Sequence, residues 1–70
     1  MITENEIEKR FTHHVPKGNQ VDRYKIIREF GMQFAKDIRT LCPDSREKSI
    51  ALTKIEEAVM WANAAIARNE

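Results

Sequence analysis

The sequence predicts an all-α protein in which a short N-terminal helix is followed by an antiparallel two-helix hairpin, assembled as a compact homo-oligomer. The composition supports the helical class, because 41% hydrophobic and 33% charged residues with only two glycines and two prolines are typical of helices with charged outer faces. Apolar residues also recur every three or four positions along two long segments. Seventy residues form a single domain, residues 1–70, whose apolar surface stays near solvent unless a partner covers it, so we expect self-association.

The first expected element is a short helix at about residues 4–11. The spacing Thr3-x-x-Glu6 lets a hydroxyl and a carboxylate cap the free amides of its first turn. The segment that follows contains a proline and a glycine, which interrupt helical hydrogen bonding and supply turn geometry. We therefore expect a loop at residues 12–19.

A long helix is expected at about residues 20–42. Pro43 disfavours helical geometry in Cys42, the residue before it, and so ends this helix. One apolar face is expected to pack inward. Its members are Val21, Tyr24, Ile27, Phe30, Phe34, Ile38 and Leu41.

The second long helix is expected at about residues 45–68. Asp44 and Ser45 offer an N-cap, and Glu47 lies three residues beyond Asp44. Its inward stripe consists of Leu52, Ile55, Val59, Ala62 and Ile66. A neighbouring stripe consists of Ala51, Ala58, Trp61 and Ala65. Because a two-helix hairpin covers only one face of each helix, this second stripe indicates packing against further protomers.

The short connection between the long helices makes them antiparallel neighbours. Each spans roughly 30 Å at about 1.5 Å per residue. The hairpin therefore has two distant ends. The loop pole comprises loop 12–19 with its flanking residues and the C-terminal end of the chain, and the turn pole comprises the PDSRE turn. Two ligand sites, one at each pole, are compatible with this geometry.

The loop pole presents rings that can stack on bases, interleaved with cations and donors that suit phosphates. An alternative is that Phe11 and Tyr24 are core residues and that the cations form a solvated face. The candidate ligand-binding residues at this pole are Phe11, His13, His14, Lys17, Arg23, Tyr24 and Arg28.

The turn pole surrounds a helix N-terminus, whose free amides and positive dipole end attract anions. Ser45, Arg46 and Ser49 are the candidate ligand-binding residues there. The alternative is a capped, solvated turn with no ligand.

No group of residues indicates an enzyme. His13 and His14 are adjacent and lack the further ligands that would complete a metal cage, so no metal site is predicted. Cys42 has no activating base nearby in the sequence and is interpreted as a structural thiol. Glu56 and Glu57 point in different directions on a helix. We predict no catalytic residue and no cofactor.

With a formal net charge of only +1, the chain lacks the overall positive field that drives non-specific binding to long nucleic acids, so no such partner is predicted. No run approaches the roughly 20 apolar residues that a membrane span needs. A single cysteine fits a reducing compartment, and the start MITENEIEKRF lacks the apolar core of a signal peptide. The predicted location is the cytosol.

Two segments, FTHHVPKGNQVDRY and LCPDSREKSIALTKIEEAVMWANAAIARNE, closely resemble the phage-encoded cyclic-nucleotide sponges that counter bacterial CBASS immunity. The resemblance covers nearly the whole chain from Phe11 and extends to the hairpin domain shared with the Thoeris-blocking sponges. At the loop entrance the family pattern is Phe-Thr-Tyr-His, and this chain has His13 in place of the tyrosine.

The resemblance implies that cyclic dinucleotides and cyclic trinucleotides are held uncleaved by a homohexamer in the host cytosol, so that host effectors are not activated. The resemblance also implies separate pockets for the two ligand classes, formed between protomers, and we assign one class to each pole as a hypothesis. Two alternatives stay open. One is a protein–protein adaptor whose Trp61 face docks a host helix. The other is a phosphodiesterase, which would need a metal cluster or an acid–base pair.

Overall fold

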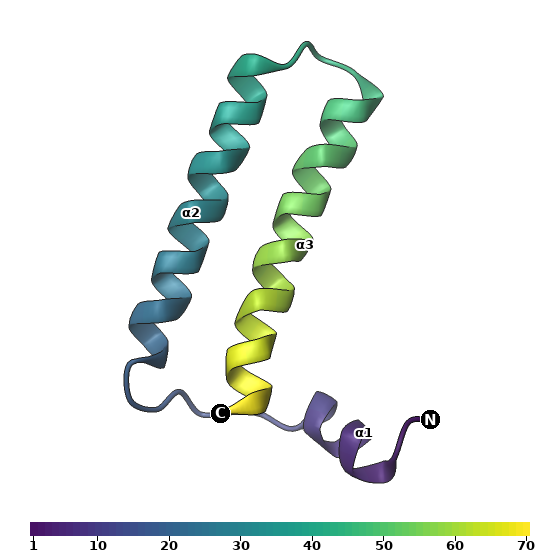
Figure 1. Cartoon of the computed structure of the whole chain (residues 1–70), viewed down its shortest axis with the longest axis vertical. Coiled ribbons are helices and arrows are strands. Elements are labelled where there is room, and N and C mark those ends of the chain that lie inside the picture. Colours follow the sequence, from purple (N-terminus) through teal and green to yellow (C-terminus); the bar gives the residue numbers. More distant parts are fainter.

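The computed structural model describes residues 1–70 and contains three α-helices and no strand. They are α1 (Glu4–Phe11), α2 (Gln20–Leu41) and α3 (Arg46–Asn69). Figure 1 shows α2 and α3 running antiparallel side by side, joined by a short turn at one end, while α1 lies beyond the open end of the hairpin. The all-α class with a helical hairpin is therefore confirmed.

The end of α2 differs by one residue from the sequence prediction. The helix begins at Gln20 but ends at Leu41 rather than at residue 42. Cys42 is the C-cap and has extended backbone, with φ −113° and ψ 141°, as expected for a residue before a proline. Its N–H still donates to the carbonyl of Ile38 at 3.1 Å, so the last turn of α2 is closed.

The observed start of α3 also differs by one residue from the prediction, because Ser45 is the N-cap and Arg46 is the first helical residue. Its Oγ accepts the N–H of Lys48 at 3.1 Å. Asp44 does not cap the helix, and its carboxylate instead accepts from the Lys48 ammonium at 2.8 Å. The helix continues to Asn69, one residue beyond the predicted end.

The capping box predicted for α1 forms only in part. Thr3 Oγ1 accepts the N–H of Glu6 at 3.2 Å, as the Thr3-x-x-Glu6 spacing predicts. The Glu6 carboxylate, however, pairs with Arg10 one turn further along the helix, at 3.3 Å. A four-residue spacing of opposite charges offers this carboxylate an exposed partner on the same helix face.

The face of α2 that meets α3 differs from the predicted one. Val21, Phe30, Phe34 and Leu41 are 57%, 73%, 55% and 79% exposed, so their prediction as inward residues is wrong for the isolated chain. At 3.6 residues per turn, the two phenylalanines and Leu41 lie about 60–100° around the helix from Gly31. The half-buried residues of α2 are Arg23, Tyr24, Ile27, Gly31, Ala35 and Ile38.

Gly31 explains why this face of α2 packs against α3. A Cβ atom added there would lie 2.3 Å from Val59 Cγ2, so α3 packs directly against the backbone of α2. Small residues at the contact allow the two helices to approach, whereas a phenylalanine at the same place would hold them apart.

The predicted inward stripe of α3 is correct in direction. Leu52, Ile55, Val59, Ala62 and Ile66 are all half-buried. On the neighbouring stripe, Ala58, Trp61 and Ala65 are exposed, Trp61 by 65%. No apolar residue is fully buried, and Gln20, 4% exposed, is the one buried residue of the chain. The hairpin alone therefore has no closed apolar core.

None of the helices has a stretch that is both long and apolar enough to span a membrane. The chain measures 44 × 31 × 14 Å along its principal axes, so the two poles of the hairpin are widely separated. Gly18, with φ +56°, supplies the left-handed residue at which the loop turns into α2.

Candidate functional site

A cavity of about 410 Å³ lies at the loop pole, where α1, the loop, α2 and α3 converge. We call it the cationic pocket. It brings together four of the seven residues predicted for this pole, namely His13, His14, Tyr24 and Arg28. Its complete lining is Arg10, Thr12, His13, His14, Tyr24, Arg28, Asn63, Ala64, Ala67 and Arg68.

Local structure positions each wall of the cationic pocket. Tyr24 and Arg28 are one turn apart on α2 and therefore lie on the same side of that helix. Asn63 and Ala67 stand in the same relation on α3. The loop wall is held at His14, whose Nε2 lies 3.0 Å from the carbonyl oxygen of Lys9.

Three arginines give the cationic pocket its charge. Arg10 is paired with Glu6, and Arg68 donates to the carbonyl of Arg10 at 3.5 Å. Arg28 takes part in none of the four ion pairs of the chain, so its guanidinium keeps its hydrogen-bonding capacity for a ligand. Guanidinium groups bind phosphates with two parallel hydrogen bonds, and the ring of Tyr24 offers a stacking surface. The arrangement suits a ligand that combines phosphates with planar bases.

Phe11 lies outside the cationic pocket. It lines a second hollow of about 600 Å³ together with Trp61, on a part of the surface where α1 faces α3. Phe11 is 85% exposed and Trp61 65%, so the alternative that Phe11 is a core residue is wrong for this chain. The two hollows share Arg10, Ala64 and Arg68 along their common border.

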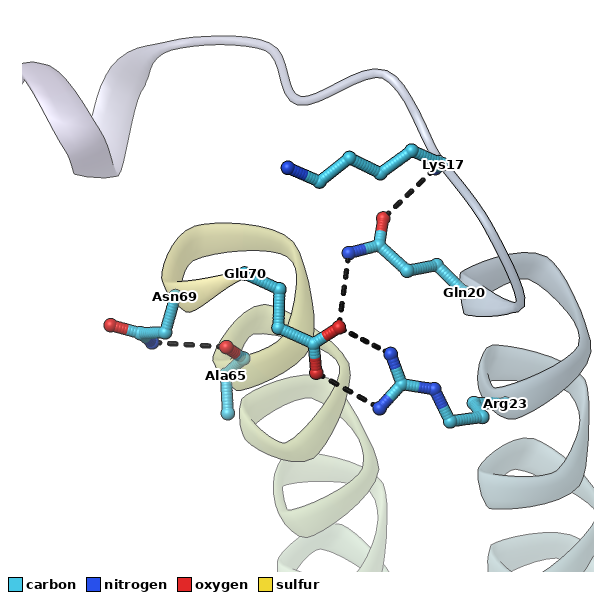
Figure 2. A network of polar contacts seen from close by, with 6 residues as sticks. All are labelled: Lys17, Gln20, Arg23, Ala65, Asn69 and Glu70. Atoms are coloured by element: carbon cyan, nitrogen blue, oxygen red, sulfur yellow. Dashed lines mark hydrogen bonds and ion pairs between the residues drawn. The ribbon is translucent and has the colours of Figure 1, made fainter.

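Lys17 and Arg23 also lie outside the cationic pocket. Figure 2 shows that both guanidinium ends of Arg23 donate to the Glu70 carboxylate, with Nη1 and Oε2 2.9 Å apart. The hydrogen bonds from Arg23 and then from Gln20 hold the pKa of the Glu70 carboxyl below its usual range, and the hydrogen bond to Glu70 raises the pKa of Arg23. The Lys17 N–H donates to the side-chain oxygen of Gln20 at 3.0 Å. Arg23 is thus engaged by a carboxylate of its own chain.

No cavity lies at the turn pole. None of the four hollows of the chain is lined by Ser45, Arg46 or Ser49. Ser45 uses its hydroxyl as the cap of α3, and Arg46 and Ser49 are exposed. The hydrogen bond from Lys48 lowers the pKa of Asp44 beside them. A ligand site at this pole stays a prediction.

Sequence reasoning missed Arg10, Asn63 and Arg68. Arginines in the last turns of α1 and α3 are sufficiently explained by the helix dipole, so their types and positions carried no signal of a site. Asn63 did carry one, because asparagine is a poor helix former placed within an alanine-rich stretch. Its Oδ1 is buried without a hydrogen-bond partner in the isolated chain.

The fold and the cationic pocket together define the class of the protein: a small helical hairpin whose open end offers a cationic, ring-lined cavity. No group of three or more His, Cys, Asp or Glu side chains is arranged to hold a metal ion. The chain matches the family described as Acb2/Tad1, hairpin domain, over residues 3–67, and it belongs to this family of anti-CBASS and anti-Thoeris sponges.

Membership implies a phage sponge for signalling molecules, which is a binding function rather than a catalytic one. No curated protein and no solved structure matches the chain.

Proposed function

We propose that the protein sequesters cyclic dinucleotides and cyclic trinucleotides of the bacterial host without cleaving them, and so blocks the activation of CBASS effectors in the host cytosol. The observation that carries this proposal is the cationic pocket, in which Arg28 has no ion-pair partner and which Tyr24 also lines. Each phosphodiester of such a messenger keeps a negative charge at neutral pH, and each base offers a flat face for stacking.

The size of the cationic pocket is in keeping with part of such a ligand. Its volume of about 410 Å³ falls within the range of small-molecule sites. Its walls come from a single protomer, and a second protomer over the open end would enclose the remainder of the ring. Enclosure between rigid protomers lowers the ordering cost of binding and slows dissociation, which a stoichiometric inhibitor needs more than turnover.

We further propose that the assembly is a homohexamer. The exposed apolar surface supports self-association, because large side chains on both long helices remain accessible in the isolated chain, and the number of six protomers is what the resemblance to the sponge family implies. Closed symmetric assembly is the usual way in which such repeated faces are covered. The exposed large side chains of α2 and α3 include Val21, Ile26, Phe30, Met32, Phe34, Leu41, Ile50, Met60 and Trp61.

Retention of the intact messenger, rather than hydrolysis, also has support. The cationic pocket contains no Asp or Glu side chain. Of its two histidines, His14 is engaged with the carbonyl of Lys9, which leaves one freely placed imidazole. Cleavage by general acid–base catalysis is most effective with two positioned groups.

Native mass spectrometry with a panel of cyclic di- and trinucleotides tests the proposal directly. We expect a homohexamer that retains the nucleotides, and chromatography after heat denaturation should recover them intact. Linear dinucleotides of the same bases serve as controls for charge alone. Release of cleaved product would favour a phosphodiesterase. A protein that binds none of the panel, yet retains a host protein through its Trp61 face, would favour the adaptor.

A further inference from the structure

Three side chains connect the two long helices at the loop pole, and we call them the polar clamp: Gln20, Arg23 and Glu70. Gln20 Nε2 donates to Glu70 Oε1 at 3.3 Å, while Gln20 Oε1 accepts the backbone N–H of Lys17. The two terminal nitrogens of Arg23 donate hydrogen bonds to the two oxygens of the Glu70 carboxylate. In Figure 2 the Glu70 side chain reaches from the end of α3 to the first turn of α2, where Gln20 and Arg23 meet it.

The polar clamp adjoins both walls of the cationic pocket. Tyr24, on the α2 wall, directly follows Arg23, and Arg68, on the α3 wall, precedes Glu70 by two residues. The contact with Lys17 also ties down the end of the loop that carries His13 and His14. At the open end of a hairpin, where helices lose backbone hydrogen bonds, such a tie limits how far the two helices can separate.

We propose that Glu70 is a positioning residue for the ligand of the cationic pocket: through Arg23 and Gln20 it holds the first turn of α2 against the last turn of α3. It thereby sets the separation of Tyr24 and Arg68, which face the ligand from opposite walls. This inference rests on the proposed function. Glu70 itself does not line the cationic pocket and acts only through the groups that it holds.

The exposure of the Arg23–Glu70 pair argues for a role in geometry rather than in stability. The two side chains are 36% and 41% exposed, and ion pairs as open as this contribute little to folding. Gln20, by contrast, is buried and would lose a hydrogen-bond partner if Glu70 moved away. Loss of the carboxylate should therefore loosen the open end locally while the hairpin stays folded.

Calorimetric titration of Glu70→Gln with cyclic di-adenosine monophosphate and cyclic tri-adenosine monophosphate tests the proposal. The amide preserves the shape and can still accept from Gln20, but it loses the ion pair with Arg23. For the ligand bound at the loop pole we expect affinity about 2- to 30-fold weaker than wild type, the range for residues that act without touching the ligand. Circular dichroism should show the same helical content at the titration temperature.

Glu57→Gln is the matched control. It makes the same substitution at a carboxylate that is 44% exposed and paired with Lys54 at 3.5 Å, on the same helix but away from the cationic pocket. Its affinity should equal that of the wild type. If the ion pairs only stabilise the fold, Glu70→Gln and Glu57→Gln should both change the melting temperature. Neither variant should then change the affinity at a temperature where the protein is folded.

The charge-exchanged double variant Arg23→Glu with Glu70→Arg restores an ion pair across the open end and should recover part of the lost affinity. Wild-type affinity in Glu70→Gln would overturn the positioning role and leave the proposed function standing. So would a folded double variant that binds no better than Glu70→Gln. If the wild type binds neither nucleotide nor any other cyclic oligonucleotide, the proposed function falls, and the positioning role falls with it.

Discussion

The backbone of Gly31 lies close to the Val59 side chain of α3. A methyl group at this position would approach Val59 Cγ2 to 2.3 Å, far inside van der Waals contact. Val59 cannot easily turn aside, because a β-branched side chain in a helix has one strongly preferred rotamer. The absence of a side chain at Gly31 therefore allows the two helices to approach closely at this point.

Gly31→Ala should destabilise the hairpin. Overpacking typically costs about 1–3 kcal/mol. The gain in helix propensity from replacing glycine returns about 1 kcal/mol. We expect the clash to prevail, with a lower midpoint in urea unfolding. Val59→Ala in the Gly31→Ala background should restore part of the loss by making room for the methyl group. A Gly31→Ala protein as stable as the wild type would contradict this account of the contact.

Arg28 and Tyr24 are the residues whose loss should affect the ligand most at the loop pole. Removing one stacking or phosphate contact costs about 1–3 kcal/mol, which corresponds to about 5- to 150-fold in affinity. Calorimetry on Tyr24→Ala and Arg28→Ala should show this loss for one ligand class. Lys25→Ala is the control, because Lys25 is an exposed cation between them in sequence that lines no hollow.

The same titrations on Arg46→Ala address the turn pole. The hypothesis of one ligand class per pole predicts that Arg46→Ala weakens the class that Tyr24→Ala leaves unaffected. Unchanged affinity for both classes in both variants would dismiss the assignment.

Acid should weaken the polar contacts of Glu70 and Asp44. The hydrogen bonds from Arg23 and Gln20 lower the pKa of Glu70, and that from Lys48 lowers the pKa of Asp44. A carboxylate with a lowered folded pKa stabilises the fold above its usual pKa of about 4, only slightly here because both carboxylates are exposed, and this small contribution is lost as the pH falls through the lower folded value.

The melting temperature should accordingly fall below pH ~4, and Glu70→Gln should make that decline shallower. Asp44→Asn should do the same at the turn pole. Parallel melting curves for the wild type and Glu70→Gln across the acid range would show that the Glu70 carboxylate has no such role.

At the scale of the elements, the turn between α2 and α3 owes its sharpness to Pro43 and Ser45. Pro43 ends α2 because it favours extended backbone at Cys42. Ser45 is the N-cap of α3, and its hydroxyl accepts the N–H of Lys48 in the first turn of that helix. Lys48 also donates to the carbonyl of Arg39 at 2.8 Å, which connects the first turn of α3 to the end of α2. The turn is thus held by contacts on both of its sides.

Ser45→Ala should destabilise the chain by about 1 kcal/mol, within a usual range of about 0.5–2, because the N–H of Lys48 loses its acceptor. Thermal unfolding followed by circular dichroism would measure the change. Ser45→Asp is the matched control, since aspartate caps helices as well as serine does and should retain most of the stability. Equal losses in the two variants would indicate that the cap bond is not what Ser45 supplies.

Helix α1 contributes to the cationic pocket although it is only eight residues long. Helices of this length are marginal in isolation and need tertiary contacts. Beyond the capping residues Thr3 and Thr12, its hydrogen bonds to the rest of the chain are those of Lys9 with His14 and of Arg10 with Arg68. Both partners line the cationic pocket, so a ligand there would stabilise α1 as well.

At the scale of the whole molecule, the chain folds without burying a single apolar side chain completely. Phe30 and Phe34 border an apolar hollow of about 480 Å³ between α2 and α3, which also includes Ala58 and Ala62. Both phenylalanines are more than half exposed. Such a surface is expected to associate with further protomers, in keeping with the proposed homohexamer.

Phe34→Lys should shift the protein towards smaller species in sedimentation velocity, because it places a charge on the apolar surface that association would bury. Gln33→Lys adds the same charge at the neighbouring exposed position and should leave the mass unchanged. A Phe34→Lys protein with the mass of the wild type would exclude this surface from the assembly interface.

Local sequence was sufficient to place the helices, because caps, turns and helix ends depend on neighbouring residues. Thr3, Gly18, Pro43 and Ser45 act within a few positions of themselves, and the observed bounds of the long helices differ from the expected ones by one residue at most at each end. The placement of Tyr24 and Arg28 in one cavity could likewise be predicted, since the two residues are one turn apart and share one side of a helix.

The choice of the contact face and of the polar partners depended on how the helices meet. The apolar spacing in α2 predicted that the face with the phenylalanines contacts α3. The observed contact face contains Gly31, where Val59 fits against backbone without a side chain. Shape as well as hydrophobicity decides which helix faces can approach closely. Arg23 was assigned to the ligand from its type, and its pairing with Glu70 could not be predicted from that type. These two residues are 47 positions apart, and only the antiparallel packing brings their charges together.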